Sequence, residues 1–197
     1  MVDILEFNRR AVEYSVALVA RVTAGDLERA TPCSAWKLSD LLAHMTVQHR
    51  GFAAAARGNG GDLGIWEVRG LADDPVADYA DAAADVLAAY AEPGVLERDF
   101  ALPEFAEDFT APGAQAVGFH FIDYVVHGWD VAATLGLDYD LPAELAGPAL
   151  EIALAVPDNE IRQTPGAAFA PAVAVDTAAS DLDRILSALG RSPRWPN

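Results

Sequence analysis

Apolar residues recur at helical spacing in four long segments of the chain, and each segment predicts a helix. The first helix is expected to begin at a cap near Asp3 and to end near Gly25. After a turn, Trp36 leads into a second helix that runs from Leu38 to about Arg57. Each helix has an apolar face that must be buried against another element.

The third and fourth helices carry clear local signals at their ends. Asp74 followed by Pro75 is typical of a cap and first turn, and the third helix then runs to roughly Ala91. A turn-rich acidic segment separates it from the fourth helix, predicted over about 113–135 and closed by Gly136.

The C-terminal part of the chain has shorter predicted helices and an extended segment. A shorter helix is expected from about Pro142 to Val156, and a segment rich in Pro, Ala and Val, from Pro157 through Pro171, is expected to be extended. A final helix follows, from about Ser180 to Leu189. We therefore predict an all-α fold: an antiparallel four-helix bundle over about 1–156 with a short C-terminal extension and helix over about 157–197, forming one domain.

Composition and charge restrict the function. The 197 residues are 52% hydrophobic, enough for a substantial core, and the formal net charge is -17. A chain this acidic would be repelled by nucleic-acid phosphates and anionic lipids. We therefore expect neither nucleic acid nor a membrane as a partner. No Lys or Arg occurs between Arg98 and Arg162, which favours a bound cation in that stretch.

The single cysteine, Cys33, excludes an intrachain disulfide and suggests a reducing compartment. The first residues lack the basic start and apolar core of a signal peptide, and no apolar run is long enough to span a bilayer. We therefore expect a cytoplasmic protein.

The fourth helix carries a narrow polar stripe on an otherwise apolar surface. His120, Asp123 and His127 lie within about 60° of one another on a helix, and Asp123 and His127 at i, i+4 can bind one ion. A further ligand would come from a facing helix, where His44 is the best-placed histidine. Three protein ligands leave one coordination position open, as catalytic metal sites require.

Simpler interpretations exist for each of these residues. A lone histidine such as His44 is more often a hydrogen-bonded core residue, and an Asp/His pair at i, i+4 also occurs on a solvated face. His120 is a candidate for a fourth ligand, a contact beside the metal or substrate, or an acid/base group, and the contact is the favoured interpretation. Asp130 is a candidate to orient a histidine, and His49 points to another side of its helix and is left out of the site.

Four segments together resemble a known family. TPCSAWKLSDLLAHM, DYVVHGWDVA, FAPAVAV and DLDRILSALGRSPRW resemble the metal-binding domain of mycothiol-dependent maleylpyruvate isomerases, in the DinB-like superfamily. The resemblance spans nearly the whole chain. It implies a DinB-like helical bundle with a divalent metal on His44, Asp123 and His127, where Asp123 replaces the usual glutamate and its shorter arm makes it the least certain of the three.

The resemblance also implies a type of chemistry. Zinc is the first choice of metal, with nickel, iron and manganese as the others, and the cofactor set includes mycothiol or another small thiol. An open metal site can lower the pKa of a thiol and present a thiolate to an electrophilic substrate, with His120 moving a proton. The isomerase carries a further C-terminal domain, so maleylpyruvate isomerisation itself is not transferred to this chain.

Three hypotheses follow from the sequence, and the simplest, a metal-free helical interaction protein, rests on the plain interpretation of each residue above; the other two involve a metal. The first is an enzyme of the thiol-dependent transferase or isomerase type, whose partners are a small thiol and an electrophilic substrate. The alternative is a non-enzymatic module that binds a metal or small molecule and in which the metal is structural. Bundles of this superfamily are often dimers, so a homodimer is an expected assembly.

Overall fold

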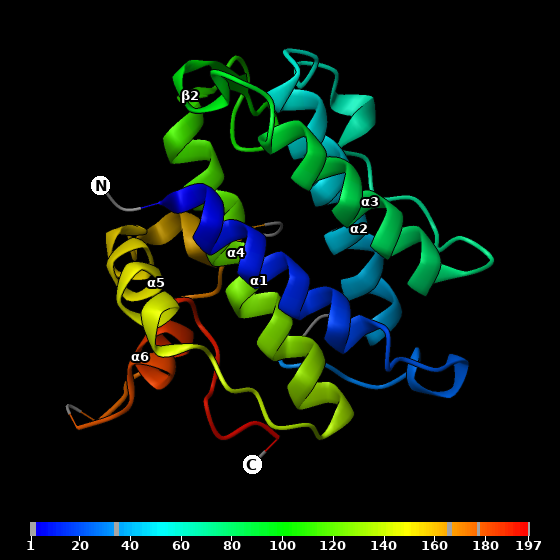
Figure 1. Cartoon of the computed structure of the whole chain (residues 1–197). Coiled ribbons are helices and arrows are strands. Elements are labelled where there is room, and N and C mark those ends of the chain that lie inside the picture. Colours follow the sequence, from blue (N-terminus) through cyan, green and yellow to red (C-terminus); the bar gives the residue numbers. More distant parts are fainter. Residues whose placement is uncertain (1–2, 34–35, 165–166, 177, 197) are drawn as a thin grey trace.

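The computed structural model describes residues 3–33, 36–164, 167–176 and 178–196. Within these ranges the chain forms six α-helices, four short 3-10 helices and one two-stranded hairpin (Figure 1). In chain order they are α1 Ile4–Val19, η1 Ala24–Asp26, α2 Leu38–Ala56, η2 Leu63–Ile65, α3 Pro75–Tyr90, η3 Val95–Glu97, β1 Asp99–Ala101, β2 Thr110–Pro112, α4 Gly113–Leu135, α5 Ala143–Ala155, η4 Glu160–Gln163 and α6 Asp181–Ala188.

The capping signals set most helix ends where the sequence predicts them. The carboxylate of Asp3 accepts a hydrogen bond from the backbone N–H of Glu6, and that of Asp74 accepts one from Ala77. Gly136 ends α4 with a positive φ of 70°, a conformation that glycine adopts without a Cβ penalty.

The end of α1 is a correction to the prediction. The helix stops at Val19 rather than near Gly25, because Thr23 and Asp26 form a capping box that starts the 3-10 helix η1. The Thr23 hydroxyl donates to the Asp26 carboxylate at 2.6 Å. A strong local cap therefore overrides the helical periodicity that continues through these residues.

The four long helices α1 to α4 form the predicted bundle, with α1 packed mainly on α4 and α2 mainly on α3. Asn8, early in α1, bonds His120 in the first half of α4. Tyr14, later in α1, stacks on Tyr139, whose hydroxyl donates to the carbonyl of Val125, later in α4. The helices α1 and α4 therefore run in the same direction. The antiparallel relations are those of α2 with α4 and of α1 with α3 (Figure 1).

Ion pairs fix the direction of α3 beside α2. Arg50 bonds Asp78, and Arg57, two turns further along α2, bonds Asp85 two turns further along α3. Two consecutive helices that run in parallel need a connection that returns along their length. Residues 57–74 make this return.

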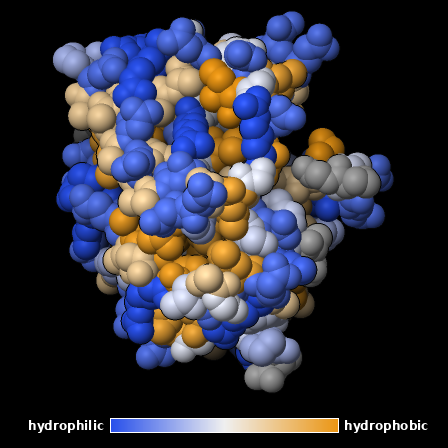
Figure 2. All heavy atoms as spheres, turned by 90° about the vertical axis from the view of Figure 1, so that its right-hand side faces the viewer, coloured by the Kyte–Doolittle hydropathy of each residue, from blue (hydrophilic) through white to orange (hydrophobic). Residues whose placement is uncertain are grey.

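Trp66 anchors the connection 57–74 to α2. Its indole N–H donates to the carbonyl of Gly60 at 2.8 Å, and its ring packs edge-on against Phe52. Gly51 is required beneath it, because a Cβ at that position would overlap the indole ring. On the side of the molecule where α2 and α3 lie, hydrophilic side chains alternate with smaller apolar areas (Figure 2).

The hairpin of β1 and β2 is the element that the pattern of the sequence did not predict. It pairs Phe100 with Ala111 in antiparallel register, and both residues are buried. Each strand has only three residues, too few for a period of two to be recognised. The loop between the strands contacts α2 through the Gln48–Glu104 hydrogen bond and α4 through the Phe105–Phe119 ring pair.

The C-terminal extension packs α6 on α5 and α5 on α4. Buried Arg162 joins its parts by donating hydrogen bonds to the backbone carbonyls of four residues: Val156, Pro157, Ala170 and Ala188. Residues 167–176 are free of helix and strand, as expected, but the extended segment predicted from Pro157 to Pro171 is interrupted by the 3-10 helix η4, whose start Asn159 caps with its side chain. Positions 165–166 lie outside the described residues. No helix in the described part of the chain is long and apolar enough to cross a membrane.

Candidate metal centre

The antiparallel packing of α2 and α4 brings His44 opposite the polar stripe of α4. Nε2 of His44 lies 4.0 Å from Oδ2 of Asp123, and Nε2 of His127 lies 3.3 Å from Oδ1 of the same carboxylate. The three ligand atoms all lie within 4.8 Å of one another. The structure thus joins one residue of α2 to two residues of α4 that are one turn apart.

The donor set suits one divalent ion. Zinc binds imidazole nitrogen and carboxylate oxygen at about 2.0–2.2 Å in tetrahedral geometry, which puts two donors about 3.4 Å apart. The observed separations of 3.3 Å and 4.0 Å need only a small contraction around an ion. His44 and Asp123 keep 21% and 18% of their side chains exposed, so the group is open to solvent on their side.

Asp130 orients the buried ligand. Nδ1 of His127 donates a hydrogen bond to Oδ2 of Asp130 at 2.9 Å, and both side chains are almost completely inaccessible. Because Asp130 holds the proton on Nδ1, Nε2, which faces Asp123, is the nitrogen that gives up its proton when His127 binds a metal. The structure confirms the predicted contact of Asp130 with a histidine.

Arg191 is a part of the centre that the sequence analysis missed. Its guanidinium donates to the Asp130 carboxylate at 3.1 Å and to the sulfur of Cys33 at 3.4 Å, and it is 3% exposed. Arg191 follows α6 and lies 61 residues from Asp130 in the sequence, and no local pattern pairs such positions. The only signal was its presence in the C-terminal segment that carries the family resemblance.

The charges around the group determine the protonation of the two histidines. Burial, with the neighbouring His127 charge, lowers the pKa of His44 to about 4, so its imidazole is neutral and free to bind a metal at neutral pH. Burial would also lower the pKa of His127, but Asp123 and Asp130 raise it above its ordinary value. Burial would raise the pKa of Asp123, and the nearby histidines, His127 first, lower it instead.

Cys33 does not have the properties of a nucleophile. Burial raises the pKa of its thiol to about 11, although Arg191 acts in the opposite direction. A thiol with so high a pKa stays protonated at neutral pH and is a poor nucleophile. Its neighbours in the turn, residues 34–35, lie outside the described part of the chain.

His120 lies in the core rather than among the three ligands. Its Nδ1 bonds Oδ1 of Asn8 at 2.7 Å and its Nε2 lies 3.2 Å from Nδ1 of His49, so protein atoms occupy both nitrogens. The residue is fully buried, and burial lowers its pKa to about 3. Its role in proton transfer stays a prediction, and the structure gives it no solvent-exposed atom.

A cavity of about 750 Å³ opens beside His44. Its walls are the first half of α2 and the last part of the connection 57–74, and Trp36 lies in its lining with the indole 4.8 Å from the His44 ring. The residues that line it are Trp36, Ser39, Asp40, Ala43, His44, Val68, Arg69, Gly70 and Leu71. The parallel course of α2 and α3 creates this space, because it places the returning connection next to the metal-binding group.

The fold and the His/Asp group define a helical-bundle protein with a candidate metal site. Residues 8–132 match the model of the mycothiol maleylpyruvate isomerase N-terminal domain, which contains both ligand-bearing helices. The chain belongs to this family. The match confirms the resemblance drawn from the sequence motifs.

The chain is similar to proteins of two kinds. Two uncharacterized proteins of Mycobacterium tuberculosis, from strains CDC 1551 / Oshkosh and H37Rv, are each 32% identical over 197 residues, covering 98% of this chain and 100% of theirs. Crystal structures of the mycothiol-dependent maleylpyruvate isomerase and of an alanine mutant match with a TM-score of 0.56 and 11% identity. They cover 77% of this chain and 68% of that enzyme, and at this identity they show a common fold.

Proposed function

We propose that this protein is a metal-dependent enzyme that uses a low-molecular-weight thiol, such as mycothiol, as its nucleophile. The observation that carries the proposal is the open group of His44, Asp123 and His127 beside a cavity large enough for a small molecule. Three protein ligands with partial exposure are typical of catalytic rather than structural metal sites. Zinc is the metal that the donor set favours.

A metal in this position would supply Lewis acidity, which lowers the pKa of a thiol that reaches it. The protein's own residues would orient the ligands and hold the reactants. Asp130 and Arg191 would keep the His127 imidazole in place, and Trp36 would provide an apolar wall over which the thiol and its electrophile could lie. The reaction class is thiol transfer or thiol-assisted isomerisation of an electrophilic substrate.

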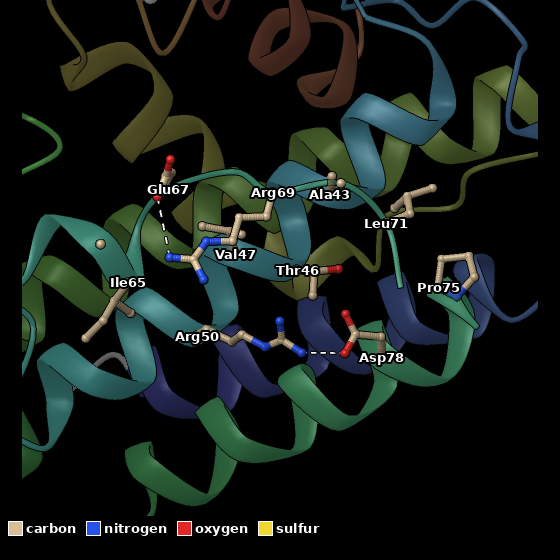
Figure 3. A pocket seen from close by; sticks show the side chains of 12 residues that line it. Ala43, Thr46, Val47, Arg50, Ile65, Glu67, Arg69, Leu71, Pro75 and Asp78 are labelled. Carbon is tan, nitrogen blue, oxygen red and sulfur yellow. Dashed lines mark hydrogen bonds and ion pairs between the residues drawn. The ribbon is translucent and has the colours of Figure 1, made fainter. Parts of the chain in front are cut away.

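The cavity beside His44 continues along α2 into a second one of about 220 Å³, with which it shares Ala43, Arg69, Gly70 and Leu71. Figure 3 shows the guanidinium groups of Arg50 and Arg69 on its lining. Both are paired with carboxylates of the same lining, Arg50 with Asp78 and Arg69 with Glu67, so their positive charges are balanced there.

The first test is metal content. Purified protein and a His127→Ala variant are compared by elemental analysis after equilibration with Zn²⁺ and gel filtration. We expect about one zinc per chain in the wild type and a loss of at least 10-fold in retained metal in the variant. Equal metal content in the two proteins would contradict the metal site.

The second test is thiol binding. Cobalt replaces zinc in such sites and gives a sulfur-to-cobalt absorption band when a thiol binds. Addition of mycothiol to the cobalt-loaded protein is expected to produce this band, and the His44→Ala variant is expected to lack it. Metal loading without any thiol band would contradict the proposed enzyme.

A second candidate function is a non-enzymatic module with a structural metal. It is favoured by the buried link from His127 through Asp130 to Arg191, which would join a bound metal to the C-terminal extension. In that case removal of the metal would loosen the extension. Limited proteolysis within residues 157–176 that increases after chelation, together with no thiol band, would support this alternative over the enzyme.

A further inference from the structure

One short stretch of the connection 57–74 forms a wall of both cavities. Val68 lines the larger cavity beside His44, Glu67 lines the smaller one, and residues 69–71 line both. Figure 3 shows this stretch running alongside α2 between the labelled Glu67 and Leu71. Residues 67–71 are called the strap below.

The strap is fixed at both ends and has no hydrogen bond to another element between them. Before it, Trp66 is 6% exposed and its indole N–H is hydrogen-bonded, and after it the carboxylate of Asp74 caps α3. Within the described part of the chain, no backbone N–H or C=O group of residues 67–73 takes part in a hydrogen bond. The side-chain bond from Arg69 to Glu67 lies inside the strap itself. The strap can therefore move without breaking a hydrogen bond to the rest of the fold.

Val68 is an exposed apolar side chain on the cavity side of the strap. It is 50% exposed, although it lines the same cavity as Trp36 and His44. A half-exposed valine in a cavity wall loses apolar surface to water when the cavity narrows, which is favourable. A Cβ added to Gly70 would meet no other part of the protein within 4 Å, so the backbone beside Val68 has open space. Leu71, partly buried against the core, holds the end of the strap that leads to α3.

We propose that the strap closes over the larger cavity when a thiol binds beside His44, and that Val68 is the side chain that covers it. The inference rests on the proposed function and adds a conformational step to it. His44 is 21% exposed and lines this cavity, so closure covers the open side of the metal-binding group. A closed strap excludes water from a thiolate held there, and it commits the bound thiol to reaction with the electrophile.

Hydrogen–deuterium exchange tests closure in the cobalt-loaded protein with and without mycothiol, while the sulfur-to-cobalt band reports binding. Without mycothiol the amides of residues 67–73 are expected to exchange freely, because they lack hydrogen bonds. Bound mycothiol is expected to slow their exchange by at least about 5-fold and to change the loop 102–109, which lines neither cavity, much less. Trypsin cleavage after Arg69, whose side chain is 75% exposed, should decrease in parallel.

The variant Val68→Ser tests the side chain that covers the cavity. Leu63→Ser is the matched control, because Leu63 is an apolar residue of the same connection, is 61% exposed and lines neither cavity. Val68→Ser is expected to bind mycothiol about 3- to 10-fold more weakly than the wild type, and Leu63→Ser is expected to bind like the wild type. Circular dichroism checks that both variants are folded. Equal affinity of the two variants would contradict the role of Val68.

Stopped-flow mixing distinguishes a closing strap from a fixed wall that only touches the thiol. Tryptophan fluorescence is followed at rising mycothiol concentrations, because Trp36 lines the cavity. A closing strap is expected to add a phase whose rate levels off at high mycothiol concentration, with a smaller amplitude in Val68→Ser.

Two results would overturn closure and leave the proposed function intact. The first is unchanged exchange and cleavage of the strap while mycothiol is bound. The second is a single fluorescence phase whose rate stays proportional to the mycothiol concentration, which would show a fixed wall. If the wild type binds cobalt but shows no thiol band, the proposed function fails and this inference fails with it.

Discussion

Asp130 accepts a hydrogen bond from Nδ1 of His127 at 2.9 Å, within one turn of α4, and the same carboxylate receives the guanidinium of Arg191. A buried carboxylate between an imidazole and a guanidinium is fully paired, which compensates for its removal from water. This arrangement turns Nε2 of His127 toward Asp123 and His44. The C-terminal extension therefore helps to set the geometry of a site whose ligands all come from α2 and α4.

The variant Asp130→Asn tests this orientation. The amide removes the negative charge that holds Nδ1–H, so His127 loses its fixed tautomer and metal affinity is expected to fall about 10- to 100-fold. Zn²⁺ affinity is measured by competition with a chromophoric chelator. Asp138→Asn, in the exposed segment after α4, is the control and is expected to bind like the wild type. Equal affinity of Asp130→Asn and wild type would contradict the orienting role.

Zinc is expected to stabilise the folded protein. At a free concentration of about 100 times the Kd, a ligand that binds only the native state adds about 2.7 kcal/mol, which for a chain of this size raises Tm by about 5–10 °C. The Asp123→Ala variant should lose this zinc-dependent rise, whereas Glu151→Ala, on the exposed side of α5, should keep it. Differential scanning fluorimetry with and without a chelator makes the comparison, and a zinc response retained by Asp123→Ala would contradict its role as a ligand.

The buried pair of His49 and His120 should make stability depend on acid pH. Burial holds the pKa of both residues well below the ordinary value of about 6.5, so the fold keeps both rings neutral. The unfolded chain binds protons on both once the pH falls below about 6.5. Their contribution is therefore complete above that pH and is lost as the pH falls further, by up to about 1.4 kcal/mol per pH unit for each ring.

Urea unfolding at several pH values between about 7 and 5 measures this effect. The variant His49→Gln keeps a hydrogen-bonding side chain next to His120 but removes one titrating ring. As the pH falls, its free energy of unfolding should decrease less steeply than that of the wild type. The difference between the two slopes should correspond to the uptake of about one proton. Identical slopes for the two proteins would show that His49 is already protonated in the fold.

Arg162 should be important for the C-terminal extension. Its guanidinium is buried and bonds four backbone carbonyls, so Arg162→Ala leaves buried acceptors without donors and is expected to lower the free energy of unfolding by about 2–4 kcal/mol. Arg184→Ala removes an exposed arginine of α6 that pairs only within its helix, and should cost less than about 1 kcal/mol. Urea unfolding compares the two, and a similar small loss in both variants would contradict this role of Arg162.

Much of the helical framework could be predicted because its signals are local. Caps such as Asp3 and Asp74, and the glycine that ends α4, act within one turn of the backbone that they stabilise. The predicted end of α1 was wrong because a second local signal, the capping box of Thr23 and Asp26, overrode the helical periodicity of the apolar residues. The parallel course of α2 beside α3 depends on the connection 57–74 and on Trp66, which no local pattern places.

The sequence by itself determined four long helices, the stripe that unites Asp123 with His127, and, through the family motifs, His44 as their partner. Helical periodicity is enough for this, because residues three and four apart must share a face. Only the tertiary structure decided the rest: it placed His44 opposite the stripe, moved His120 into the core with His49, and brought Arg191 to the site. These contacts join residues that are 61 to 79 positions apart, and only helix packing brings such residues together.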